Sequence, residues 1–231
     1  IKRIYEKNRD KFALAEKYGV LTRATIGQGL ATPMFFMGAQ NLVYYSVDYE
    51  QAFKELAVIE KEVVFKRISI AKDYGVDLLK RFGGYEMTNF FTPEQFDKFV
   101  LPYLAETITE TKKYDLPIYY RVVTGMKPLL DKIADVGFDM VEGFEPELSD
   151  CSNRDIHDAF YRKTCLWTGV SSPVCLGHTD DKKVRAAVKE CMTLFNDTPF
   201  ILGVTNSIRN HWSFENTKAM MDEYRKLSEG K

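Results

Sequence analysis

Apolar positions along the chain recur with two spacings, one typical of helices and one typical of strands. Helical spacing predicts helices over residues 1–18, 33–43, 48–74, 92–113, 126–136, 179–195 and 213–227, and a shorter helical piece over 155–160. Short β-rich runs predict strands over 20–26, 76–82, 116–123, 137–142, 165–170 and 200–205. No hairpin signal joins any two of these strands, so we expect parallel strands connected by crossover helices.

Several of these elements carry signals at their ends. Gly19 and Gly75 stand where a helix closes, as the C-terminal glycine of a helix does. Thr92-Pro-Glu-Gln95 has the pattern of a capping box with Pro in the first turn. We expect Asp48 to cap the long helix that follows it and Thr179 to cap the helix that starts with two acids.

Six strands that each precede a helix favour a (β/α)8 barrel of the TIM type. A complete barrel of this kind has eight strands and about 250 residues, whereas this chain has 231 residues and begins without Met inside an amphipathic helix. We therefore expect residues 1–231 to be one barrel domain, the C-terminal major part of a longer barrel that lacks its first one or two β/α units here. An open doubly wound sheet is the alternative, but no G-x-G-x-x-G motif follows an early strand to support it.

Composition narrows the class of partner. The formal net charge is -1, so no excess of Lys and Arg is present to neutralise nucleic-acid phosphates or an anionic membrane surface. The 45% hydrophobic content is sufficient for a packed core. The four Cys form no C-x-x-C pair, and no run of about 18 apolar residues occurs. These features predict a cytoplasmic protein with free thiols that binds neither nucleic acid nor membrane.

One carboxylate and two imidazoles follow separate predicted elements in the second half of the chain. Glu142 ends a strand, His157 lies on the short helical piece, and His178 precedes the helix that starts near Thr179. Such a set suits a divalent metal. The alternatives are a buried ion pair between Glu142 and Arg121, a surface position for His157, and a solvent-facing position for His178 beside the helix cap.

Polar groups also lie at the ends of other predicted strands, where barrel sites form. Arg81 and Arg121 end two strands, and Arg binds carboxylate or phenolate oxygens with two parallel hydrogen bonds. Gln28 and Asn206 follow the first and the last strand, and Tyr120 offers an aromatic wall. We expect Gln28, Arg81, Tyr120 and Asn206 to bind substrate, while salt bridges and core packing are the alternative roles of Arg and Tyr at such positions.

From Asp48 onward the chain resembles the uroporphyrinogen decarboxylase superfamily, which includes corrinoid-linked methyltransferases. The resemblance is carried by Gly75-Val-Asp77, Thr92-Pro-Glu-Gln-Phe96 leading to Leu101-Pro-Tyr103, Leu116-Pro-Ile118, Ala134-Asp-Val-Gly-Phe-Asp139 and Phe214-Glu-Asn-Thr-Lys-Ala-Met220. It covers roughly three quarters of the chain and implies a barrel whose site lies at the C-terminal ends of the strands.

Two departures from this superfamily are informative. Thiol-directed methyltransferases of the superfamily have a His-x-Cys where this chain reads Tyr120-Arg-Val-Val123, and a further Cys where it reads Val204-Thr-Asn206. Decarboxylases have a His near the end of the last strand, whereas the nearest one here is His211. The spacing of Glu142, His157 and His178 is instead similar to the acid-acid-histidine zinc pattern of the methyltransferase component of aryl methyl ether O-demethylases, with His157 in place of the middle acid.

This resemblance implies a zinc-assisted methyltransferase. It would take the methyl group of a methoxylated aromatic compound and pass it to a corrinoid protein, with Glu142 and Arg121 acting in the chemistry and Glu142, His157 and His178 holding zinc to polarise the ether oxygen. The alternative enzyme is a decarboxylase-like protein that acts on a tetrapyrrole through its arginines without a metal. A barrel that only binds a ligand or a partner is the third possibility.

Overall fold

The structure is a computed structural model that describes residues 2–229. The chain forms two compact units. The first unit consists of Ile1–Arg121 with Val136–Asp139, and the second of Val122–Asp135 with Met140–Lys231. Each unit contains three parallel strands together with several helices.

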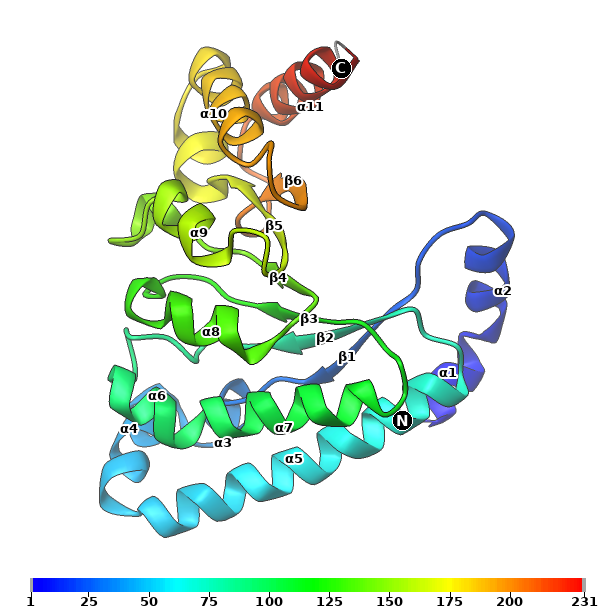
Figure 1. Cartoon of the computed structure of the whole chain (residues 1–231), viewed down its shortest axis with the longest axis vertical. Helices are drawn as coiled ribbons and strands as arrows, with labels where there is room; N and C mark the ends of the chain where they lie inside the picture. Colours follow the sequence, from blue (N-terminus) through cyan, green and yellow to red (C-terminus); the bar gives the residue numbers. More distant parts are fainter. Residues whose placement is uncertain (1, 230–231) are drawn as a thin grey trace. The chain divides into compact units, whose positions relative to one another are not determined.

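The first unit places its strands side by side in chain order. Its strands are β1 Arg23–Gly27, β2 Leu78–Phe82 and β3 Ile118–Arg121, and its helices are α1 Lys2–Lys7, α2 Arg9–Lys17, α3 Ala31–Met37, α4 Ala39–Asp48, α5 Glu50–Asp73, α6 Pro93–Phe99 and α7 Leu101–Lys112. The helices α5 and α7 lie side by side along these strands (Figure 1).

The two faces of these three strands differ in character because successive side chains of a strand point to opposite sides. Ala24 and Leu79 are buried on the face that α5 covers. A shift in register pairs Gly27 with Arg81 on this face, and a Cβ at Gly27 would lie 2.7 Å from Val64 of that helix. Arg23 alternates with them on β1 and is exposed. The core of the first unit therefore lies between the strands and α5.

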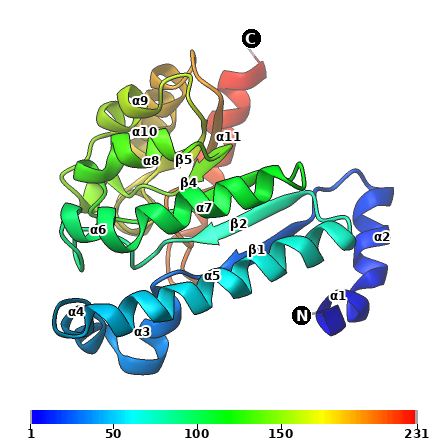
Figure 2. The same cartoon turned by 60° about the horizontal axis from the view of Figure 1, so that its bottom comes forward.

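The second unit repeats this order of strand and helix. Its strands are β4 Met140–Glu142, β5 Cys165–Val170 and β6 Phe200–Val204, and its helices are α8 Leu130–Val136, which ends in the first unit, α9 Asn153–Phe160, α10 Asp181–Leu194 and α11 Phe214–Glu229. Three short helical turns complete it: η1 Lys127–Leu129, η2 Pro146–Leu148 and the π-helical η3 Ser172–Leu176. The helices α10 and α11 lie together (Figure 2) and enclose a core that includes Val184, Val188 and Met220.

The predicted fold class is confirmed, since the described strands are parallel and alternate with helices in chain order. The strand over 165–170 has its predicted bounds, and Thr92 and Gln95 form the predicted capping box. The prediction that the chain is one barrel domain, the rear part of a longer barrel, stays a prediction.

Several helix boundaries differ from the prediction. Gly38, with a φ of 81°, separates α3 from α4 where one helix was expected over 33–43. Asp48 ends α4 instead of capping α5, whose N-cap residue is Tyr49. A break at Val100 divides the helix expected over 92–113, because Pro102 has no N–H for a continuous helix. The side chain of Asp180, rather than that of Thr179, caps α10.

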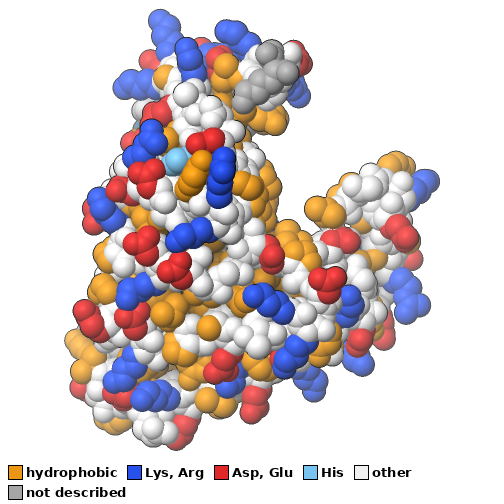
Figure 3. Space-filling model, viewed as in Figure 1, with side chains coloured by type: hydrophobic (Ala, Val, Ile, Leu, Met, Phe, Trp, Pro, Cys, Tyr) orange, Lys and Arg blue, Asp and Glu red, His pale blue; other side chains and the backbone are white. Residues whose placement is uncertain are grey.

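The surface shows no segregation of charge on the face drawn in Figure 3, where basic and acidic side chains are interspersed. Among the described residues, no helix has both the length and the apolar composition needed to cross a bilayer.

Candidate functional site

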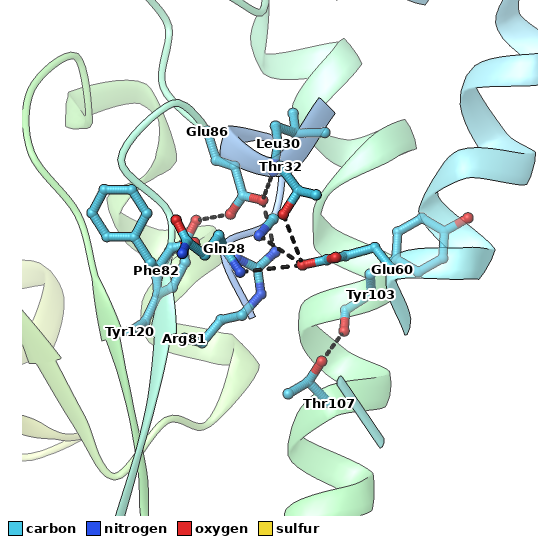
Figure 4. Close-up of polar contacts among 11 residues, drawn as sticks. Gln28, Leu30, Thr32, Glu60, Arg81, Phe82, Glu86, Tyr103, Thr107 and Tyr120 are labelled. Atoms are coloured by element: carbon cyan, nitrogen blue, oxygen red, sulfur yellow. Dashed lines mark hydrogen bonds and ion pairs between the residues drawn. The ribbon is translucent and has the colours of Figure 1, made fainter. Parts of the chain in front are cut away.

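In the first unit, a buried carboxylate gathers groups from the ends of all three strands. Glu86, in the loop after β2, accepts hydrogen bonds from Arg81 Nη2 at 2.7 Å and from Tyr120 Oη at 2.7 Å (Figure 4). The backbone N–H of Leu30, after β1, donates to the same carboxylate at 3.1 Å. We call Arg81, Glu86 and Tyr120 the Glu86 cluster, and all three side chains are buried.

Within the Glu86 cluster, neighbouring charges and burial fix the protonation states of Arg81 and Tyr120. Burial by itself lowers the pKa of Arg81, but the neighbouring Glu86 and Tyr120 outweigh burial and raise the pKa above its ordinary value. Burial, followed by the negative charge of Glu86, raises the pKa of Tyr120 well above 10. Arg81 therefore stays cationic and Tyr120 stays a neutral donor, which are the states that the Glu86 carboxylate needs.

The loop after β1 requires glycine beside this cluster. Gly29 has a φ of 50°, and a Cβ there would lie 1.9 Å from Glu86 Oε1. The N–H groups of Gln28 and Gly29 donate to Glu60 Oε1 of α5 at 3.1 and 3.2 Å. Two carboxylates, Glu60 and Glu86, thus hold the backbone of this loop (Figure 4), while the side chain of Gln28 is exposed.

The opposite face of the same strands is basic. Arg23, Lys80 and Arg121 alternate with the covered residues of β1, β2 and β3. Arg23 Nη1 donates to Tyr119 Oη at 2.6 Å, and the Lys80 ammonium lies 5.9 Å from the centre of the Tyr119 ring. Two of the predicted residues, Arg81 and Tyr120, therefore lie on the covered face, whereas Arg121 lies on the basic one.

In the second unit, the buried acid at the C-terminal ends of the strands is Glu145. Glu145 follows β4 and is only 2% exposed. Its Oε2 accepts a hydrogen bond from Thr205, just after β6, and its backbone N–H donates to Val123 O at 2.8 Å. Its Oε1 is buried without a hydrogen-bond partner among the described residues. We call Glu145 together with Thr205 and Ser171, which follows β5, the Glu145 site.

The environment of Glu145 favours its protonated form. Burial raises the pKa of the Glu145 carboxyl, and hydrogen bonds from Thr205 and Ser171 oppose that shift only in part. The preceding residue, Phe144, is buried with a φ of 59°, a conformation that is strained for a bulky side chain. A strained residue next to a desolvated acid, as Phe144 is next to Glu145, is typical of functional sites.

The three predicted metal ligands are not brought together. Both ring nitrogens of His157 face acids, with Nδ1 2.8 Å from Asp158 Oδ1 and Nε2 3.0 Å from Asp197 Oδ1. Asp197 precedes β6, at the strand end opposite to the Glu145 site. His178 is exposed, and Glu142 is buried at the end of β4.

No group of three or more His, Cys, Asp or Glu side chains within residues 2–229 is placed to hold a metal ion. The residues present therefore do not fit the predicted zinc centre, and no step proposed below passes through a metal. Asn206, the remaining predicted residue, exchanges backbone hydrogen bonds with the Ser172 hydroxyl at 2.7 and 2.9 Å. Its side-chain Oδ1 accepts from the Ser207 N–H at 2.8 Å.

Sequence reasoning missed Glu60, Glu86 and Glu145. The signal for Glu86 was the double glycine Gly83-Gly84 after β2, which lets the loop turn back over the strand end. The signal for Glu145 was its place three residues after the strand that ends in Glu142. Acids in such loops are frequent, and only the fold shows which of them are buried.

The parallel strands and the polar groups at their C-terminal ends define an α/β protein of the barrel type. The family model of uroporphyrinogen decarboxylase (URO-D) matches residues 28–227, and the chain belongs to this family. No curated protein matches the chain significantly.

Two solved structures are similar to the chain in fold. A methyltransferase from Methanosarcina mazei is 18% identical with a TM-score of 0.77, and the match covers 94% of this chain and 62% of that one. The 3-keto-D-glucoside 4-epimerase from E. coli is 9% identical with a TM-score of 0.55, covering 98% of this chain and 86% of the epimerase. This chain thus spans 62% of the length of the methyltransferase, and at these identities the likeness concerns the fold.

Proposed function

We propose that this chain belongs to a methyltransferase that removes the methyl group of a methoxylated aromatic compound and passes it to a corrinoid protein. Membership of the uroporphyrinogen decarboxylase family and the fold shared with a methyltransferase support this proposal. The observation that carries it is Glu145, a desolvated acid at the strand ends whose pKa is raised by burial and whose Oε1 has no hydrogen-bond partner among the described residues.

An aryl methyl ether resists methyl transfer because its leaving group is a phenolate, the conjugate base of an acid with a pKa near 10. A proton delivered to the ether oxygen removes this obstacle, since neutral phenol then leaves. General acid catalysis of this kind contributes about 10²–10⁴-fold to a rate. Glu145 is suited to this role because its carboxyl is buried at the strand ends, with Oε2 held by Thr205 and Oε1 left without a hydrogen-bond partner among the described residues.

The proposed reaction balances without a metal. The bond between the methyl carbon and the ether oxygen breaks, and its electron pair stays on oxygen, which takes the proton of Glu145. A reduced corrinoid on the partner protein supplies the nucleophile that accepts the methyl group. Glu145 is left as a carboxylate and regains its proton from water, while the phenol departs.

The test compares Glu145→Gln with wild type, using methoxyarenes whose phenols span several pKa units and free cob(I)alamin as the methyl acceptor. We expect the variant to lose about 10²–10⁴-fold in rate with the most basic leaving groups. The loss should shrink as the leaving group becomes more acidic, because a good leaving group needs no proton. Phenol released per unit time is the readout, and unfolding curves show whether the variant is folded.

Two results would contradict the proposal in different ways. An equal loss of rate with all leaving groups would show that Glu145 is not the proton donor. Absence of demethylation by the wild-type protein would contradict the proposed methyltransferase activity. The matched control is Glu215→Gln, a substitution of an exposed acid in the first turn of α11 that has no part in the Glu145 site, and it should leave the rate unchanged.

The alternative, a decarboxylase-like enzyme for a tetrapyrrole, draws on a different feature. The basic face of the first unit, with Arg23, Lys80 and Arg121, offers cations to the carboxylates of such a substrate. Incubation with uroporphyrinogen distinguishes the two functions. Release of carbon dioxide, lost in Arg23→Gln and Lys80→Gln variants, would favour the decarboxylase.

A further inference from the structure

The first unit contains a cavity that none of the functions above uses. It has a volume of about 320 Å³ and lies among α3, α5 and α7, against the covered face of the strands. Native interiors contain few voids larger than a water molecule, and pockets for small ligands begin at about 300 Å³. The cavity is therefore large enough for a small organic molecule.

The walls of the cavity are largely aromatic and aliphatic. Phe53 and Phe99, each 3% exposed, form its inner wall with their ring centres 4.9 Å apart in an edge-to-face arrangement. Val64 and Val100 extend this wall, and Phe36, which is 86% exposed, stands at the rim. A benzene molecule occupies an apolar cavity of about 150 Å³ in another protein, so one substituted aromatic ring fits here.

The carboxylate of Glu60 is a hydrogen-bond acceptor in the lining of the cavity. Glu60 accepts three hydrogen bonds through Oε1, from the Gln28 and Gly29 N–H groups and from Thr32 Oγ1 at 3.5 Å. Within residues 2–229 Glu60 forms no salt bridge, whereas two cations of the lining are each paired with an acid. These pairs are Lys61 with Glu106 at 2.8 Å and Arg81 with Glu86 at 2.7 Å.

This arrangement selects the polar group that a ligand would carry. Two carboxylates in the lining, Glu60 and Glu86, disfavour an acidic ligand. Three cations in the same lining, Lys61, Arg67 and Arg81, disfavour a positively charged one. A neutral hydrogen-bond donor on an aromatic ring satisfies both conditions, and a hydroxyl group is such a donor.

We propose that this cavity binds a small aromatic molecule bearing a hydroxyl group, which donates its hydrogen bond to Glu60. The same carboxylate holds the N–H groups of Gln28 and Gly29 in the loop after β1. A bound ligand therefore fixes Glu60 and, through it, the backbone of that loop at the C-terminal end of β1. The cavity is in this way an effector site coupled to the C-terminal end of β1, and barrel sites form at such strand ends.

The test is a ¹⁹F NMR titration of the whole chain with 4-fluorophenol and with 4-fluorotoluene, which lacks the donor. We expect saturable binding of both, with 4-fluorophenol about tenfold tighter. Glu60→Gln should narrow this ratio to about threefold or less, because hydrogen bonds to a charged acceptor are roughly twice as strong as those to a neutral one. Equal affinity of the two probes in wild type would overturn the assigned hydroxyl.

Two neighbouring substitutions on α5 locate the site. Ala57 lines the cavity, so Ala57→Phe should abolish binding of both probes. Val58 is 41% exposed and lies outside the lining, so Val58→Phe should bind like wild type. Thermal unfolding establishes that both variants are folded. Absence of saturable binding to wild type, or unchanged binding to folded Ala57→Phe, would overturn the site.

Hydrogen exchange tests the coupling to the loop. Saturation with 4-fluorophenol should slow exchange of the Gln28 and Gly29 amides severalfold, since a fixed Glu60 holds their hydrogen bonds closed. Unchanged exchange at both amides would overturn the effector role. Because neither measurement involves methyl transfer, their outcome is independent of the proposed function.

Discussion

Glu86 and Glu145 are both buried acids that follow a strand, but their surroundings differ. Glu86 has a cation, a hydroxyl and a backbone N–H directed at its two oxygens. Glu145 has the Thr205 hydroxyl on one oxygen and no hydrogen-bond partner on the other among the described residues. The first acid therefore has hydrogen-bond partners on both oxygens, whereas burial raises the pKa of the second.

This difference separates a structural role from a chemical one. A carboxylate whose oxygens are all engaged stabilises the fold but has nothing left to offer a ligand. A desolvated acid with one oxygen left without a hydrogen-bond partner costs stability when it ionises, and such a cost is common at functional sites. We therefore expect substitutions at the Glu86 cluster to affect stability first and substitutions at Glu145 to affect reactivity and pH dependence.

The largest effect is expected from Arg81→Met. Removing the guanidinium leaves the Glu86 carboxylate buried without its cation, and breaking a buried pair in this way costs about 3–5 kcal/mol. Urea unfolding measures the loss. The double variant Arg81→Met/Glu86→Gln should recover part of it, because no buried charge is left.

The control for Arg81→Met is Lys163→Met, which removes an exposed ion pair with Asp135. We expect it to cost less than about 1 kcal/mol. A cost for Arg81→Met as small as that of Lys163→Met would show that Glu86 does not depend on its cation, and the contrast with Glu145 would then fail.

A smaller effect is expected from Tyr120→Phe. This variant removes one hydrogen bond to a buried charge, which is worth about 1.5–3 kcal/mol. Tyr119→Phe is the matched control, since the Tyr119 hydroxyl accepts its bond from Arg23, whose side chain is exposed. Chemical unfolding should show the larger loss for Tyr120→Phe, and the reverse order would contradict the central place of Glu86.

Glu145→Gln should change how stability depends on pH. Because the pKa of Glu145 is raised on folding, its contribution to wild-type stability is fully present below its unfolded pKa and is lost as pH rises through the folded value. The variant lacks this loss, so its stability relative to wild type should increase from pH 4 to pH 8. Unfolding free energies across this range are the measurement, and parallel profiles would argue against a proton held by Glu145.

The smallest effect is expected from His157→Gln. Hydrogen bonding to Asp158, and then to Asp197, raises the pKa of His157 against the opposing effect of burial. The stability that protonated His157 contributes is present below pH 6.5 and is lost as pH rises through the raised value. The difference between wild type and variant should therefore shrink between pH 6 and pH 9.

The exposed His211 provides the control for this comparison. His211→Gln should leave the slope of stability against pH unchanged over the same range. A stability difference between wild type and His157→Gln that does not vary with pH would contradict an imidazolium shared by the two acids.

Local patterns were sufficient to predict most of the elements, but they do not record which side chains the fold brings together. The strand over 165–170 and the capping box at Thr92 were predictable because hydrophobic spacing and a cap depend on neighbours in the sequence. Arg81 and Tyr120 were recognised as important, but alternation places them on the helix-covered face, where they serve Glu86. The predicted metal ligands were selected by their spacing in the sequence. Spacing does not show that both ring nitrogens of His157 form hydrogen bonds, one with Asp158 and one with Asp197.

The sequence by itself determined the alternation of strands and helices, the parallel class and the family, because each depends on periodicity and motifs that are read along the chain. Only the tertiary structure decided which acids lie buried at the strand ends and which of their oxygens are engaged. Burial and hydrogen bonding depend on residues far apart in the sequence, as Glu145 and Thr205 are, and no local pattern records such a contact.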